Sequence, residues 1–152
     1  QSLGGAMGVH YLATHPARRA QLQAVVLDGT PANYQDVARN VLAGAWLTWP
    51  LQVPLSWMVP QADSAQFAMP QLGGLPVLIF QSIDDQVVPL SSGITLYKAA
   101  RPPRVLQLTR GAHVETFSEP VWREVMLGYL QDPAGFSGLR RLAEAPLGES
   151  PQ

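Results

Sequence analysis

The chain combines short apolar runs with longer segments whose apolar residues have helical spacing. Three short runs are bounded by polar or turn-forming residues and occupy positions 24–27, 76–80 and 105–108. The first two are continuously apolar, and Gln107 is the only polar residue in the third. Short apolar runs of this kind predict strands that are buried on both faces of a parallel sheet.

The first segment with helical spacing covers residues 3–15. Leu3, Met7 and Tyr11 fall at i, i+4 and i+8, which puts them on one apolar stripe, and Pro16 is expected to end the helix. A second helix is predicted over residues 91–100, with Ser91 or Ser92 as its N-cap.

The third predicted helix covers residues 119–131. Pro120 is placed for the first turn, and Val121, Val125, Met126 and Tyr129 share one face. Helices and strands thus alternate along the chain, which predicts an α/β fold with parallel strands and right-handed crossovers.

Residues 31–72 differ from the rest and predict a helical cap or lid insert. Helical patches alternate there with prolines, and three of the four tryptophans of the chain, Trp46, Trp49 and Trp57, lie in this segment. A long aromatic connection suits a cap over an apolar pocket, and ordinary helical packing is the alternative. We assign residues 1–131 to one domain and residues 132–152, rich in Gly, Pro and Ala, to a tail.

Composition narrows the function classes without selecting one. The net charge is −1, and charged residues make up 14% of the chain, so nothing favours nucleic acid or an anionic membrane surface as a partner. The absence of cysteine excludes disulfides and thiolate metal sites, and we expect no cofactor and no metal. No apolar run reaches the length of a spanning helix. A signal or anchor upstream of Gln1 would escape notice, so the compartment stays open, with the cytoplasm favoured.

The candidate chemistry begins at the first residues, which read QSLGGA. With one glycine in front they would complete the motif G-x-S-x-G, in which a serine sits on a strained turn between a strand and a helix. Ser2 is therefore a candidate nucleophile, and the N–H of Leu3 is a candidate for half of an oxyanion hole. We expect the first glycine, the delivering strand and the second oxyanion donor to lie upstream.

Ser2, Asp85 and His113 all follow predicted strands, counting the expected upstream strand before Ser2. The carboxyl ends of parallel strands meet at one edge, where ligands bind in open α/β sheets. An imidazole can take the serine proton near neutral pH, and a carboxylate can fix its tautomer. Asp84 and, more weakly, Asp28 are rivals for the acid.

Other candidates have simpler interpretations. Glu115 is expected to be a solvated loop residue, and His10 and His15 to lie on or at the end of the first helix without metal-ligand spacing. Gly73 and Gly74 indicate a loop, because no phosphate-binding Lys-Ser/Thr helix follows.

These elements resemble the α/β-hydrolase superfamily, and are most similar to its serine-hydrolase branch of Bem46-type and peptidase-like proteins. The resemblance covers residues 1 to about 131 and rests on QSLGGA, on PVLIF with DQVVP, on GITLY and on GAH. It implies Ser2 as nucleophile, Asp85 as acid and His113 as base. The chain departs from the family in carrying Gln-Ser at 81–82, where relatives often have His-Gly, and in lacking the N-terminal half.

Two hypotheses follow. The first is a serine hydrolase that cleaves a small, hydrophobic ester, in preference to an amide, through an acyl-serine intermediate. The second is a truncated or non-catalytic hydrolase-like module that needs its missing half or a partner, because the unpaired backbone groups of an exposed edge strand can bond to another strand.

Overall fold

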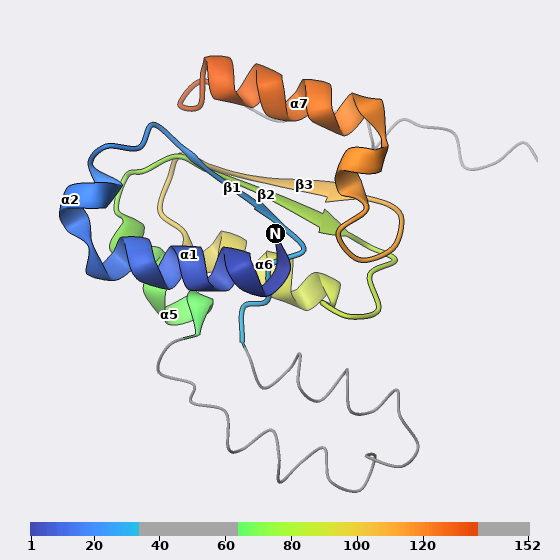
Figure 1. Ribbon diagram of the computed structural model, residues 1–152, viewed down its shortest axis with the longest axis horizontal. Helices are drawn as coiled ribbons and strands as arrows, with labels where there is room; N and C mark the ends of the chain where they lie inside the picture. The colour runs from blue at the N-terminus through green and yellow to red at the C-terminus, as the bar shows by residue number, and fades with distance from the viewer. Residues whose placement is uncertain (34–63, 137–152) are drawn as a thin grey trace, which may run out of the picture.

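The computed structural model of the chain describes residues 1–33 and 64–136. They form three layers, with helices on both faces of a parallel sheet (Figure 1). Most of the predicted cap, residues 34–63, and most of the predicted tail, residues 137–152, lie outside the described residues. No helix in the described ranges combines the length and the hydrophobicity needed to cross a bilayer.

The sheet consists of β1 (Val25–Asp28), β2 (Val77–Ser82) and β3 (Arg104–Thr109), in that spatial order. All pairs are parallel, and Val25, Val77 and Arg104 lie side by side in register. Each strand lies where an apolar run predicted it, and β2 is buried along its whole length.

One boundary differs from the predicted run at 76–80, because β2 continues through the polar residues Gln81 and Ser82. Both residues stay in the ladder, opposite Leu108 and Thr109 of β3. The Nε2 of the buried Gln81 amide donates to the carbonyls of Val88 at 2.9 Å and Ser82 at 3.2 Å, whereas its Oε1 is buried without a partner among the described residues.

One face of the sheet is covered by four helical segments (Figure 1). They are α1 (Ser2–Thr14), α5 (Ala65–Ala68), the 3₁₀ helix η2 (Met69–Leu72) and α6 (Leu90–Ala99). The short helix α2 (Pro16–Arg19) follows α1, so Pro16 both ends one helix and begins the next. The predicted N-cap of α6 was wrong, because Pro89 occupies that position and Ser91 and Ser92 lie inside the helix.

Helix α1 buries a different face from its apolar stripe. Leu3, Met7 and Tyr11 are exposed, whereas the buried residues are Gly5, Ala6, Val9 and Ala13. Small side chains let the helix backbone approach the sheet closely. A Cβ built on Gly5 would collide with the Thr30 hydroxyl. Close approach, rather than bulk, therefore selects the buried face.

Helix α7 (Pro120–Gln131) covers the opposite face, and Pro120 lies in its first turn as predicted. Its buried residues are Trp122, Val125 and Tyr129; the predicted contribution of Val121 was wrong, because that side chain is exposed. Trp122, Val125 and Tyr129 fall at i, i+3 and i+7, so they share one helical face. The tryptophan ring meets Phe80 of β2 edge to face at 6.3 Å.

Candidate active site

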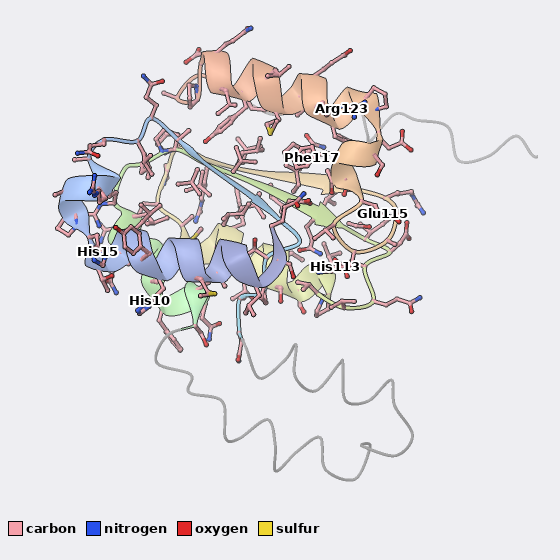
Figure 2. All side chains as sticks on the ribbon, viewed as in Figure 1. His10, His15, His113, Glu115, Phe117 and Arg123 are labelled. Carbon is pink, nitrogen blue, oxygen red and sulfur yellow. The ribbon has the colours of Figure 1, made fainter. Side chains whose placement is uncertain are left out.

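Side chains from three distant segments meet at the carboxyl edge of the sheet. His113 Nε2 lies 2.8 Å from Ser2 Oγ, and His113 Nδ1 lies 2.7 Å from Asp85 Oδ2. Ser2 begins α1, Asp85 follows β2, and His113 follows β3. Figure 2 labels His113 beyond the carboxyl end of the sheet, near the N-terminal end of α1. The structure thus brings together the three residues that the sequence selected.

Ser2 has a strained backbone conformation, as the motif G-x-S-x-G predicts. Its φ is 47°, in the left-handed region that non-glycine residues rarely adopt. The helix starts immediately, with Gly5 N donating to Gln1 O at 3.1 Å. Leu3 lies in the first turn, where backbone N–H groups have no carbonyl one turn earlier. Its N–H can therefore serve an oxyanion, as expected from the motif.

Asp85 is buried and held by backbone hydrogen bonds. Its side chain is 1% exposed. Oδ1 accepts hydrogen bonds from the backbone N–H groups of Val87 at 2.8 Å and Val88 at 2.9 Å, which leaves Oδ2 for His113. Gln81 extends this support, since its amide bonds the carbonyl of Val88. The contribution of Gln81 was missed from sequence, although its polar side chain at the end of an apolar strand was a usable signal.

The imidazole of His113 is partly open to solvent, with 19% of the side chain exposed. The pairing fixes its tautomer: Nδ1–H donates to the Asp85 carboxylate, and Nε2 accepts from the Ser2 hydroxyl. Gly29, whose φ is +53°, lies close to this ring. A Cβ at Gly29 would lie 3.3 Å from His113 Cε1 and Nδ1 and 3.5 Å from Asp85 Oδ2. The absence of a side chain at Gly29 therefore leaves room for the side chains of Asp85 and His113.

The two rival acids are occupied elsewhere. Asp84 is exposed and lies 3.5 Å from the Arg110 guanidinium. Asp28 is buried; Oδ2 accepts from Gln1 Nε2 at 3.0 Å and Oδ1 accepts from Thr116 Oγ1 at 2.7 Å. Thr116 was not predicted as part of the site, because nothing in the loop sequence marks it.

The remaining candidates lie outside the site. Glu115 is exposed and accepts a bond from its own loop, from Ala112 N at 3.3 Å. His15 follows the last residue of α1 and stacks on Tyr11, with ring centroids 4.0 Å apart. Figure 2 shows His10 and His15 well away from His113. Within residues 1–33 and 64–136, no three potential ligands gather as a metal site would require.

A depression in the surface lies at the opposite edge of the sheet. Its lining includes Pro16, Arg19, Leu72 and Pro76. Pro76 immediately precedes β2, so the depression faces the amino ends of the strands, and the three convergent side chains face the carboxyl ends. It therefore plays no part in the chemistry of this site.

No family model matches the chain. The sequence is similar to the Escherichia coli K12 protein YfhR, described as uncharacterized, at 25% identity over 134 residues, covering 86% of this chain and 43% of YfhR. The chain therefore spans less than half the length of this relative.

Solved structures with other sequences share its architecture. The esterase domain of a Rhodothermus marinus protein superposes with a TM-score of 0.63 at 21% identity, covering 89% of this chain and 60% of that one. The Pyrococcus horikoshii acylaminoacyl peptidase superposes with a TM-score of 0.60 at 14% identity, covering 93% of this chain and 25% of that one. Together with the parallel sheet and its helical layers, these neighbours show that the chain has an α/β-hydrolase fold.

Proposed function

We propose that this chain carries the catalytic residues of a serine hydrolase that cleaves a carboxylic ester. The single observation that carries the proposal is the continuous relay from Ser2 Oγ through His113 to Asp85, with bonds of 2.8 and 2.7 Å. Nucleophile, base and orienting acid within hydrogen-bonding distance are the signature of nucleophilic catalysis.

The relay supports a two-step reaction. Ser2 Oγ attacks the ester carbonyl carbon while His113 Nε2 takes the hydroxyl proton, forming a tetrahedral intermediate with a negative oxygen. The intermediate collapses, the carbon–oxygen bond to the alcohol breaks, and His113 returns the proton to the departing alcohol. Water then attacks the acyl-serine, again losing a proton to His113. Collapse releases the carboxylic acid, and the proton on His113 returns to Ser2.

The other residues act on charge and orientation. Asp85 holds the imidazole in the required tautomer and stabilises the imidazolium in both steps. The N–H of Leu3 supplies one donor to the negative oxygen, and we propose that the second comes from an upstream loop. The chain would then be the C-terminal portion of a longer hydrolase of the Bem46-like and peptidase-like branch, in keeping with its 43% coverage of YfhR.

We propose an ester in preference to an amide because an alcohol leaves more readily than an amine, and His113 Nε2 would protonate either leaving group. The Rhodothermus marinus neighbour is an esterase domain, which favours an ester, whereas the Pyrococcus horikoshii neighbour is an acylaminoacyl peptidase. A hydrophobic acyl or alcohol portion is proposed from the aromatic, proline-broken sequence of residues 31–72.

A fluorophosphonate probe on the full polypeptide that carries these residues tests the proposal. Wild type should become labelled and hydrolyse p-nitrophenyl esters, and Ser2→Ala should lose both. Ser91→Ala, which alters an exposed serine on α6, is the matched control and should keep both. Undiminished labelling of Ser2→Ala would remove Ser2 from the mechanism.

The second candidate is a non-catalytic module that pairs through its sheet edge. Among the described strands, β1 is bonded on one side only, to β2. An open edge strand favours addition of another strand. Absence of labelling in wild type, together with a solution mass above that of the monomer, would favour this candidate over the hydrolase.

A further inference from the structure

The buried carboxylate of Asp28 is not used in the mechanism above, yet it contacts the neighbours of both reacting residues. We infer that Asp28 is a positioning residue that holds the Ser2 turn and the His113 loop in register. This inference rests on the proposed hydrolase function. We call Gln1, Asp28 and Thr116 the Asp28 bridge.

The bridge joins three segments through one side chain. Asp28 is the last residue of β1 and is 3% exposed. Its Oδ2 accepts from Gln1 Nε2 at 3.0 Å, and its Oδ1 accepts from Thr116 Oγ1 at 2.7 Å. Gln1 immediately precedes Ser2, and Thr116 opens the 3₁₀ helix η3 (Thr116–Ser118), just after the His113 loop. Each carboxylate oxygen therefore serves one of the two segments that must meet.

The energetic consequence follows from burial. A carboxylate removed from water is costly unless hydrogen bonds replace its hydration. Here one donor comes from the Gln1 segment and one from the Thr116 segment. If either segment moves away, one carboxylate oxygen of Asp28 loses its hydrogen bond while it stays buried. This free-energy penalty keeps the two segments together, in addition to the direct 2.8 Å contact between His113 and Ser2.

The next residue extends the same support. A Cβ added at Gly29 would lie only 3.3 Å from His113 Cε1 and Nδ1, so the backbone after β1 approaches the imidazole closely. The end of β1 therefore lies close to the His113 ring at Gly29 and reaches the Ser2 turn through the hydrogen bond of Asp28 with Gln1. Asp28 does not replace Asp85 as the acid, because His113 Nδ1 already donates to Asp85 at 2.7 Å.

Substitution of the donors tests the role while leaving the reacting groups intact. Thr116→Val removes the hydroxyl and keeps the shape, whereas Thr116→Ser restores the hydroxyl. Gln1→Met removes the other donor and keeps the length of the side chain. Because Gln1 is exposed, this variant still tests the bridge if Thr116→Val, at a buried position, misfolds. Asp28→Asn changes the central carboxylate itself, and Asp132→Asn, outside the site, is its control.

The readouts are fluorophosphonate labelling rate, kcat and KM for an ester, thermal midpoint, and the downfield proton resonance of His113 Nδ1–H in the full polypeptide. We expect Thr116→Val and Gln1→Met to lower labelling and kcat about tenfold, since small misplacements of reacting groups are costly, with KM changed far less. The His113 resonance should broaden in Thr116→Val. Thr116→Ser should recover rate and resonance, and Asp132→Asn should match wild type.

Wild-type labelling rates in Thr116→Val, Gln1→Met and Asp28→Asn would overturn the inference, as would failure of Thr116→Ser to recover what Thr116→Val loses. A wild type that is not labelled would instead reject the proposed hydrolase. The resonance would then decide the bridge by itself: an unchanged His113 proton in folded Thr116→Val would refute it, and selective broadening would support it.

Discussion

His113 Nε2 lies 2.8 Å from Ser2 Oγ, although 111 residues separate the two along the chain. The contact is possible because both residues lie at the carboxyl edge of one parallel sheet, where α1 begins and β3 ends. His113 meets Asp85 on its other nitrogen. The fold therefore converts large sequence separations into two adjacent hydrogen bonds.

Asp85→Asn should reduce kcat by about 10⁴-fold, as loss of the orienting acid does in serine proteases. The amide would present a donor to His113 Nδ1, which favours the tautomer with its proton on Nε2, facing Ser2. Asp84→Asn is the matched control, because Asp84 is exposed and its contact with Arg110 is a surface ion pair. Steady-state kinetics on an ester checks both, and equal losses would contradict the assignment of Asp85.

The Gly29→Ala variant should be less active than wild type, and the loss of activity should exceed what its reduced stability explains. Its positive φ strains any L residue, and its Cβ would press on the His113 ring at 3.3 Å. Gly73→Ala is a close control: φ is +66°, but nothing lies within 4 Å of the added Cβ. Both variants should lose about 1 kcal/mol of stability, and only Gly29→Ala should lose labelling. Equal labelling in both would show that the contact with His113 is unimportant.

Two glycines of α1 should respond in opposite directions. Gly5→Ala should destabilise by about 1–3 kcal/mol, because its Cβ would collide with the buried Thr30 side chain. Gly8→Ala should stabilise by about 0.5–1 kcal/mol, because that position is open and alanine favours a helix. Urea unfolding measures both. A stabilising Gly5→Ala would contradict the close packing of α1 on the sheet.

Tyr129 should make the protein sensitive to alkali. Burial raises the pKa of its phenol above the ordinary 10.0. Above about pH 10 the unfolded state loses the proton and the folded state keeps it, so stability is retained below that pH and falls as the pH rises through the raised pKa. Tyr129→Phe should flatten this fall, measured by urea unfolding between pH 8 and 11. Tyr11→Phe is the control on an exposed residue, and an unchanged alkaline fall in Tyr129→Phe would reject the assignment.

Much of this architecture could be predicted from local patterns. The parallel strands followed from apolar runs, and Ser2, Asp85 and His113 were selected because each follows a strand in a parallel sheet, including an expected strand before Ser2. The catalytic roles of these residues stay predictions.

The features that were missed depend on three-dimensional fit. Helix α1 buries small residues, a choice set by the distance to Thr30, and periodicity favoured the bulkier Leu3 stripe. The hydrogen bond from Thr116 to Asp28 spans 88 residues and leaves no local pattern. Val114 adopts a positive φ of 55° beside His113, which its β-branched side chain would not predict.

The most direct test is to locate the fluorophosphonate adduct by peptide mass spectrometry in the full polypeptide, using wild type, Ser2→Ala and His113→Gln. The account predicts one adduct, on the oxygen of Ser2 in wild type, absent from Ser2→Ala and at least about 10³-fold slower to form in His113→Gln. An adduct on another residue, or one that forms in Ser2→Ala at the wild-type rate, would contradict it.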